Sequence, residues 1–239
     1  MIEKLILKLR HLDTVSKEEE QALRAAASEP HIFCKGQTLV KARTELNFSS
    51  LLVSGLVQSF NAVHDGSCQT VHLAIPGDFI DLHSLLLKTM DHSILALTPC
   101  KIAMVPHEAL RRITEAYPHL TRMLWLSTLI DSAMHREWLV SVGRRSPVAH
   151  IAHLICEVFS RLEQVGKVQD GSFQFPITQV ELGDMLGLST VHANRSLQQL
   201  RAENVITWRG TTVIILDWDR LQEIAEFDPT YLNLVEEPR

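Results

Sequence analysis

The chain has 239 residues, enough for one large domain or two small ones, and we expect two. A hydrophobic fraction of 46% and a charged fraction of 21% are ordinary for a globular protein. No apolar run approaches the roughly 18 residues that cross a membrane, and the N-terminal MIEKLILKLRHL lacks the pattern of a secretory signal. These features exclude a membrane-spanning protein and predict a cytoplasmic location.

The cysteines and the net charge exclude further classes. Cys34, Cys68, Cys100 and Cys156 are far apart and form no C-x-x-C pair, so neither a zinc ribbon nor a disulfide framework is indicated. We interpret them as reduced and mostly structural. The net charge of -5 argues against indiscriminate polyanion binding but is compatible with a locally basic face.

The N-terminal half reads as a helical segment followed by strands. An amphipathic segment covers about residues 2–27, and short apolar runs broken by Gly, Pro, Asn and Asp follow from about Ile32 to Val105. SSLLVSGLVQSF, CQTVHLAIPGDF and SILALTPCKIAMVP are typical of strands, and the Asp65–Gly66 pair predicts a tight hairpin. The pattern predicts a small sandwich or roll within an α+β fold.

A long helix is predicted from Pro118 to Gly143, because no Pro or Gly interrupts its interior. It carries two neighbouring apolar stripes: Met123, Leu126, Ile130, Ala133 and Val140 form one, and Leu120, Leu124, Ser127 and Met134 form the other. One stripe can cover the β-domain and the other a second copy of the chain. We therefore expect a homodimer formed by residues 120–142, with a helix sunk in its own core as the alternative.

The C-terminal part reads as a helical domain with a hairpin. Ser146 is a predicted N-cap with Pro147 at the first helical position, and this helix ends at Gly166. NVITWRGTTVIILD then has two β-rich runs joined through Arg209 and Gly210, followed by a short helix from about Asp219.

Between these elements, ITQVELGDMLGLSTVHANRSLQQLRAENVI predicts two helices joined by a sharp turn. Thr178 and Glu181 form a capping box, so the first helix begins at Gln179 and ends near Leu186. Gly187 permits the turn, and Ser189 caps the second helix. A helix pair followed by a hairpin predicts a winged helix-turn-helix.

The second helix has a polar side that suits the major groove of DNA. At about 100° per residue, Ala193, Leu197 and Leu200 share the inner side. The outer side holds Val191, His192, Arg195, Gln198 and Gln199. Arginine can chelate guanine, glutamine can bracket adenine, and an exposed valine can meet a thymine methyl. No carboxylate occurs between Asp184 and Glu203, as a surface close to phosphates requires.

GDFIDLHSLLL, the long helix and the helix-turn-helix segment together resemble the Crp/Fnr family of bacterial transcription regulators, over essentially the whole chain. The resemblance implies a cupin-like β-roll that senses a signal, a dimerisation helix, and a winged helix that binds a palindromic operator and contacts RNA polymerase. The expected boundaries are residues 1–117, 118–143 and 144–239, the last with a short C-terminal extension.

The resemblance also implies which residues meet the DNA. It places Thr190, Val191 and Arg195 at base edges. The full predicted set is Thr178, Ser189, Thr190, Val191, His192, Arg195, Gln198, Gln199 and Arg209, of which Ser189, His192 and Gln198 are expected nearer to phosphates.

This chain departs from the cyclic-AMP-binding branch of the family. That branch has Gly-Glu-Leu directly after Gly-Asp-Phe-Ile and then Arg-Ser-Ala, whereas Leu82 stands here at the glutamate position and His92 at the arginine position. We therefore expect no response to cyclic AMP or cyclic GMP. The expected effector pocket is Leu82, His83, His92 and Ser93, holding a small and less anionic molecule. The iron–sulfur branch uses a cysteine cluster near its N-terminus, and the first cysteine here is Cys34.

Two rival functions were weighed. His64, His72, His83 and His92 form no tight His-x-His or His-x-x-x-His pair, so we predict no metal ligand set and no cofactor. The alternative left open is a metal- or haem-dependent sensor whose helix pair serves protein–protein contacts. Asp81, His83 and Ser84 lack a nucleophile elbow, so we predict no catalytic residue and no enzyme.

Overall fold

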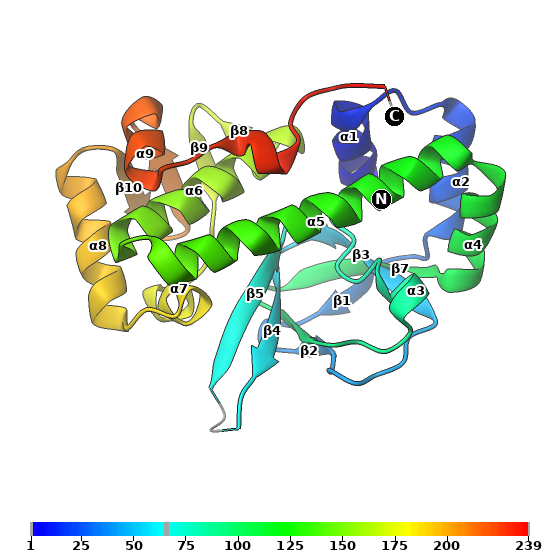
Figure 1. The fold of residues 1–239 in the computed structure, drawn as a ribbon, viewed down its shortest axis with the longest axis horizontal. Helices are drawn as coiled ribbons and strands as arrows, with labels where there is room; N and C mark the ends of the chain where they lie inside the picture. Colours follow the sequence, from blue (N-terminus) through cyan, green and yellow to red (C-terminus); the bar gives the residue numbers. More distant parts are fainter. Residues whose placement is uncertain (1, 65–66, 239) are drawn as a thin grey trace. The chain divides into compact units, whose positions relative to one another are not determined.

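The computed structural model describes residues 2–64 and 67–238 (Figure 1). The predicted Asp65–Gly66 hairpin lies outside the described residues. Contacts divide the chain into two compact units: unit 1 is Met1–Asn61, His72–Ser132 and Asn233–Arg239, and unit 2 is Ala62–Val71 and Ala133–Leu232. None of the helices in the described ranges is both long enough and apolar enough to span a bilayer.

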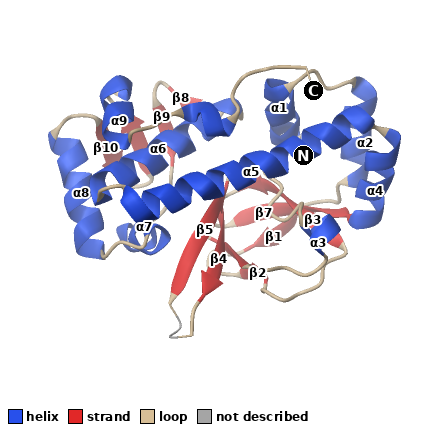
Figure 2. Cartoon of the chain, in the orientation of Figure 1, coloured by secondary structure: helices blue, strands red, loops and turns tan. Residues whose placement is uncertain are grey.

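The first part of the chain forms two antiparallel sheets flanked by helices (Figure 2). The strand orders are β1-β7-β3 and β2-β6-β4-β5. The strands are β1 His31–Phe33, β2 Thr38–Val40, β3 Phe48–Ser54, β4 Val57–Ala62, β5 Cys68–Ala74, β6 Ser93–Ala96 and β7 Cys100–Pro106. The helices are α1 Glu3–Leu12, α2 Lys17–Ala26, α3 Ser84–Leu87, α4 His107–Ala116 and α5 Pro118–Arg144. The predicted α+β class with an N-terminal β-roll is confirmed.

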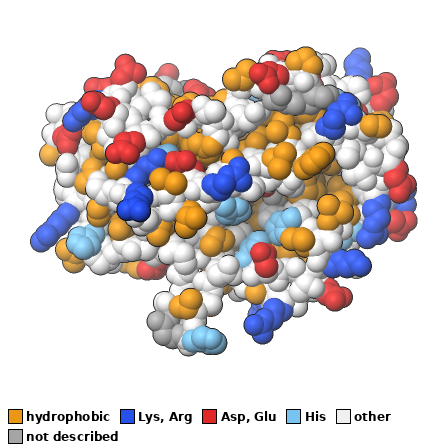
Figure 3. All heavy atoms as spheres, in the orientation of Figure 1, with side chains coloured by type: hydrophobic (Ala, Val, Ile, Leu, Met, Phe, Trp, Pro, Cys, Tyr) orange, Lys and Arg blue, Asp and Glu red, His pale blue; other side chains and the backbone are white. Residues whose placement is uncertain are grey.

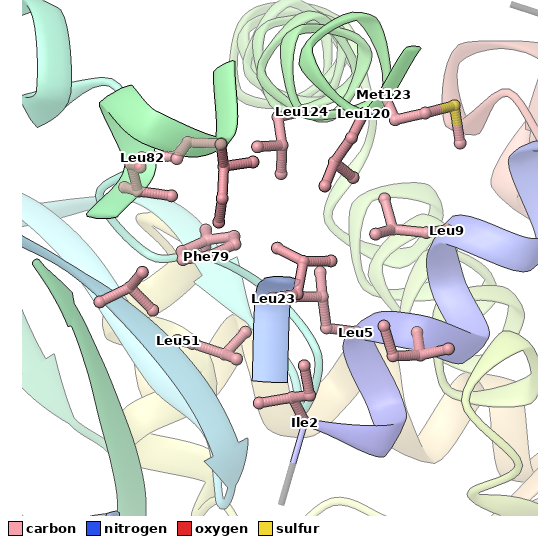
Figure 4. Close-up of a cluster of buried hydrophobic side chains, with 14 of the residues drawn as sticks. Ile2, Leu5, Leu9, Leu23, Leu51, Phe79, Leu82, Leu120, Met123 and Leu124 are labelled. Atoms are coloured by element: carbon pink, nitrogen blue, oxygen red, sulfur yellow. The ribbon is translucent and has the colours of Figure 1, made fainter. Parts of the chain in front are cut away.

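Strand β3 contributes to two hydrophobic clusters of unit 1, because successive side chains of a strand point to opposite faces. Leu52 lies with Val57, Ile94 and Ile102 in a cluster formed by the strands. Leu51 lies on the other face, in a cluster supplied by α1, α2, α4 and the start of α5. Figure 4 shows this second cluster, in which side chains from the helices and from the segment at Phe79 and Leu82 point toward one another.

The opening amphipathic segment forms two helices, with a break at Asp13–Ser16. Ser16 starts α2 with a capping box: its hydroxyl accepts from the Glu19 amide, and the Glu19 carboxylate accepts from the Ser16 amide. Glu19 also accepts from His119 Nδ1 at 2.8 Å, and Asp13 lies 3.1 Å from His119 Nε2. The hydrogen bond to Glu19 and, less strongly, the one to Asp13 raise the pKa of His119 despite its partial burial.

Helix α5 has 27 residues and follows the predicted range, but its two apolar stripes do not separate as expected. Leu120, Met123 and Leu124 are all buried, and Leu126 and Ile130 pack against the same cluster. Both predicted stripes thus begin in the core of unit 1. The large apolar side chains that stay exposed on this helix are Trp125, Leu129, Leu139, Val140 and Val142.

Unit 2 contains the predicted winged helix-turn-helix. Its helices are α6 Pro147–Gln164, α7 Gln179–Leu186, α8 Thr190–Ala202 and α9 Trp218–Ala225, followed by a 3-10 turn at Pro229–Leu232. Its strands are β8 Val168–Gln169, β9 Ser172–Gln174, β10 Ile206–Arg209 and β11 Thr212–Ile215, in the order β10-β11-β9-β8. Ser146 caps α6 with Pro147 in its first turn, as predicted.

A buried polar network joins the C-terminal part of α5 to α6 within unit 2. The Glu157 carboxylate is fully buried and accepts from Trp138 Nε1 at 3.0 Å, from the Tyr231 hydroxyl at 2.9 Å and from Arg161 at 3.1 Å. Burial raises the pKa of Glu157, while Arg161 and the other donors oppose that rise. A buried carboxylate with three donors is costly to disturb, because loss of one partner leaves charge unsatisfied.

Two histidines of α6 are buried beside this network. His150 and His153 are 4% and 2% exposed. Burial, with the charge of Arg145 as a further cause, lowers the pKa of each to about 4. Both are therefore neutral in the folded protein at pH 5, whereas an unfolded histidine is mostly protonated there.

Acidification should therefore destabilise unit 2 through His150. With a folded pKa near 4 and an unfolded pKa near 6.5, the unfolded state binds more protons between these values, so this contribution is complete above about pH 6.5 and is lost toward pH 4. For His150 the loss between pH 7 and pH 5 is about 2 kcal/mol.

The measurement is urea unfolding at pH 7 and pH 5, followed by tryptophan fluorescence, since Trp138, Trp208 and Trp218 all lie in unit 2. His150→Leu should show a drop about 2 kcal/mol smaller than the wild type. His192→Leu, which removes an exposed histidine of the same unit, should keep the wild-type drop. Equal drops in wild type and His150→Leu would contradict the assignment.

Candidate nucleic-acid interface

Local hydrogen bonds fix the start of α7, the turn after it and the start of α8. The Thr178 hydroxyl accepts from the Glu181 amide at 3.1 Å, and the Glu181 carboxylate accepts from the Thr178 amide at 2.7 Å. Gly187 ends α7 at φ 66, in the left-handed region that favours glycine. The Ser189 hydroxyl accepts from the His192 amide at 3.3 Å and starts α8. The predicted helix bounds and caps are confirmed.

The turn also depends on Gly183, which the sequence reasoning did not identify. The Leu188 amide donates to the Gly183 carbonyl at 2.8 Å, which brings the turn back against α7. A Cβ on Gly183 would lie 2.7 Å from the Leu188 oxygen, closer than such atoms approach in proteins. The sequence signal is a glycine four residues before the turn glycine, inside a helix where glycine is otherwise unfavourable.

Burial orients α8 as the periodicity predicts. Ala193, Leu197 and Leu200 are at most 1% exposed, whereas Val191 is 59% exposed. The predicted residues outside the core are all exposed: Thr178, Ser189, Thr190, Val191, His192, Arg195, Gln198, Gln199 and Arg209. The structure thus brings eight of these nine to α8 and the caps of the two helices, and places Arg209 at the end of β10 in the hairpin.

The predicted DNA-binding residues differ in whether their side chains already have hydrogen-bond partners. Within the described part of the chain, the side chains of Arg195 and His192 form no hydrogen bond or ion pair. Gln199 is engaged, because its amide donates to Glu203 at 3.1 Å. Hydrogen bonds from Gln199 and then from Arg220 lower the pKa of Glu203, so this carboxylate is ionised at neutral pH, at the C-terminal end of α8. The first turns of α8 are therefore its unobstructed part.

Two further side chains fix the interface. Asn194 donates to Gln179 Oε1 at 2.7 Å, which connects α8 to the first residue of α7. Arg201 donates to the Trp208 carbonyl at 2.9 Å, which connects α8 to strand β10 of the hairpin. A shallow pocket lined by Thr178, Gln179, Arg201, Trp208, Gly210 and Thr211, among others, lies between these elements. The pocket brings the α7 N-terminus and the hairpin to one surface, where helix amides can face a phosphate.

The four residues predicted to form an effector pocket have different surroundings in the structure. Leu82 is 7% exposed and belongs to the hydrophobic cluster with α1 and α5 (Figure 4). His83 and His92 lie together, with ring centroids 5.3 Å apart. The Ser93 hydroxyl accepts from the Ala42 amide at 3.0 Å, so it has a structural role. The structure thus brings the two histidine rings together, whereas the Leu82 side chain packs into the core, and the effector pocket itself stays a prediction.

The residues weighed as a hydrolase constellation have separate partners. Asp81 is fully buried and accepts from the amide and the hydroxyl of Ser50, and its burial raises its pKa to about 7. Ser84 Oγ lies 3.1 Å from His107 Nε2. These contacts hold the loop before α3 and do not connect Asp81, His83 and Ser84 as nucleophile and base.

Comparisons with known proteins agree with this architecture. Residues 30–117 match the cyclic nucleotide-binding domain family, and residues 149–224 match the Crp-like helix-turn-helix domain family. The transcriptional activator protein FnrL of Cereibacter sphaeroides is 27% identical over 198 residues, which cover 81% of this chain and 79% of FnrL. The fumarate and nitrate reduction regulatory protein of Escherichia coli is 22% identical over 80% of this chain and 76% of its own length.

The fold is also found among solved structures. The structure of FixK2 from Bradyrhizobium japonicum superposes with a TM-score of 0.73 at 20% identity, covering 83% of this chain and 96% of FixK2.

The close approach at Gly183 generates a stability prediction. Gly183→Ala should destabilise unit 2 by about 1–3 kcal/mol, because the Leu188 carbonyl belongs to the backbone and must shift to admit the methyl group. Gly143→Ala is the matched control: its Cβ would meet no described atom within 4 Å, so it should leave stability unchanged or raise it by about 0.5–1 kcal/mol. Urea unfolding followed by tryptophan fluorescence measures both, and equal stability of Gly183→Ala and wild type would contradict the packing argument.

Proposed function

Because the chain belongs to the Crp/Fnr family of DNA-binding transcription regulators, we propose that it binds a palindromic operator as a homodimer, with α8 in the major groove. The observation that carries the proposal is the exposed side of α8, on which Arg195 and Val191 project while Ala193 and Leu197 are buried beneath them. A rigid helix that presents arginine, glutamine and valine offers the donors and the methyl groups that distinguish base pairs.

The roles of individual residues follow from their position on α8. Arg195 lies at the centre of the exposed side and is assigned to a guanine edge, with Val191 one turn earlier at a thymine methyl. Ser189, His192 and Gln198 are assigned to phosphates. Gln199 has the smallest part in this scheme, because contact with DNA must replace its hydrogen bond to Glu203.

The hairpin completes the proposed interface. Arg209 is exposed at the end of β10, directly before Gly210, whose φ of 57 forms the turn. An arginine at this tip can neutralise a backbone phosphate beside the groove. RNA polymerase is proposed as a further partner on the family resemblance, and the domain boundaries 1–117, 118–143 and 144–239 are retained as part of the proposal.

A selection of bound DNA from a random pool tests the function. The expected product is an inverted repeat bound with steep salt dependence, since several phosphates are neutralised. Arg195→Ala should weaken binding to that site by roughly 1–3 kcal/mol and relax preference at one base pair of each half-site. Val191→Ala should change base preference without changing the salt slope.

Arg112→Ala is the matched control for Arg195→Ala, because Arg112 is an exposed arginine of α4, paired with Glu108. It should bind as the wild type does. Recovery of no sequence from the pool, or full affinity of Arg195→Ala for the selected site, contradicts the proposal. Binding to a protein partner with little salt dependence would favour a protein-contact function for the helix pair.

The proposed dimer uses the exposed side of α5. Trp125 and Leu129 are 64% and 51% exposed, and Leu139 and Val140 are 74% and 47% exposed further along the helix. Figure 3 shows hydrophobic side chains at the surface along the band where α5 lies in Figure 1. Trp125, Leu129 and Val140 lie within about 60° of one another around the helix, so they form one face. Two copies of one helix face can cover each other about a two-fold axis.

Sedimentation at micromolar concentration should give twice the 27.0 kDa mass of the chain. Leu129→Glu places a charge in the proposed contact and should shift the protein to monomer, because a buried unpaired carboxylate is strongly unfavourable. Ile32→Glu adds the same charge at an apolar residue of β1 that is 74% exposed, and it should remain dimeric. A wild-type monomer, both with and without operator DNA, is the result that rules out this dimer.

A further inference from the structure

Two histidines and an aspartate come together beside helix α3. His83 directly precedes α3, and Asp91 and His92 directly precede strand β6. Each of the three offers one ligand atom, and these atoms all lie within 4.8 Å of one another. We propose that His83, Asp91 and His92 bind a divalent transition-metal ion. The proposal goes beyond DNA binding, and no step of it depends on that function.

The ligand set suits this class of ion. Two imidazoles and one carboxylate bind zinc or iron(II) and leave further positions for water or a small ligand. Metal–ligand distances of about 2.0–2.2 Å place ligand atoms roughly 3–3.5 Å apart around one ion. Closure by an ångström or so is therefore needed, and the Asp91 side chain, 74% exposed, has room to move.

The His92 ring supplies independent support. Its side chain is 12% exposed, and its Nδ1 lies 2.7 Å from Asp91 Oδ1. Among the described residues, none forms a hydrogen bond with its buried Nε2. A buried imidazole nitrogen without a partner carries an energetic cost, which a bound metal removes. For Asp91 to join His92 Nε2 as a ligand, its carboxylate must leave His92 Nδ1, and its exposure leaves room for that movement.

The charges favour a cation over an anion. Asp91 brings a carboxylate to the two rings, with its Oδ1 2.7 Å from His92 Nδ1. A carboxylate disfavours phosphate or another anion but is a good ligand for a divalent metal. Zinc or iron(II) is thus the chemistry that this cluster recognises.

Hydrogen bonds hold both of the chain segments that carry the proposed ligands. The buried Asp81 carboxylate accepts from the Ser50 amide and hydroxyl, which holds the chain two residues before His83. Met90 is 1% exposed, and its amide donates to the Thr44 carbonyl at 3.0 Å, which holds the chain directly before Asp91. Ligands on anchored backbone lose little freedom on binding, which favours metal affinity.

The test uses the full chain without an affinity tag, stripped of metal with a chelator and then desalted. Calorimetric titration with Zn²⁺ should show one strong site per chain. Titration with Co²⁺ should give visible absorption bands of a protein-bound ion. His92→Gln and His83→Gln should each weaken binding at least about tenfold.

Asp91→Asn should also weaken binding. Because Asp91 is exposed, this variant should fold, so the metal site can still be tested if a histidine variant does not fold. His64→Gln removes an exposed histidine outside the cluster and should bind as the wild type does. Circular dichroism confirms that each variant is folded. No DNA is used, so the result is independent of the operator experiments.

Several outcomes would reject the metal site. Absence of a stoichiometric site in the wild type, or unchanged affinity in both His92→Gln and Asp91→Asn, rejects the metal site. Equal weakening in His64→Gln shows scattered surface binding and also rejects it. A micromolar dissociation constant for cyclic AMP that His92→Gln abolishes would assign the histidine to a phosphate instead.

Discussion

The burial of Ala193, Leu197 and Leu200 is the constraint on which the interface depends. These side chains are held against the rest of unit 2 with almost no exposure, so the opposite side of α8 must face outward. A shift of one residue would rotate the helix by about 100° and carry Arg195 toward the core, at the cost of burying an unpaired charge. The Ser189 cap fixes where the helix begins, and it therefore also fixes which residues reach the exposed side.

The same unit contains a second constraint that serves specificity of structure more than stability. Glu157 receives hydrogen bonds from Trp138 on α5, from Arg161 on α6 and from Tyr231 near the end of the chain. An apolar core would be as stable, but it would not select one partner for each donor. The network thus sets the C-terminal part of α5 in one register against α6.

Local signals were sufficient to predict the two helices of the helix-turn-helix in unit 2, but not strands β8 and β9. The caps at Thr178 and Ser189 and the left-handed Gly187 act over three or four residues, so the sequence contains the whole interaction. The same capping signal at Ser16 marks the break between α1 and α2. Contacts between residues far apart in the sequence could not be predicted in this way. Which side of α5 is covered, and the burial of Leu82, depend on how helices and strands pack, and periodicity alone does not encode this.

The histidine pair shows how a contact between residues apart in the sequence can change which ligand the β-roll suits. His83 and His92 are nine residues apart, so they match no short metal-binding motif. The chain from α3 to β6 brings their rings together. In the cyclic-AMP-binding branch of the family that the chain resembles, an arginine that holds a phosphate stands at the position of His92. Exchanging that arginine for histidine removes a permanent positive charge and a bidentate donor. Asp91 adds a carboxylate beside it, so the local charge now suits a cation. The class of ligand proposed for this loop thus follows from the few side chains that it displays.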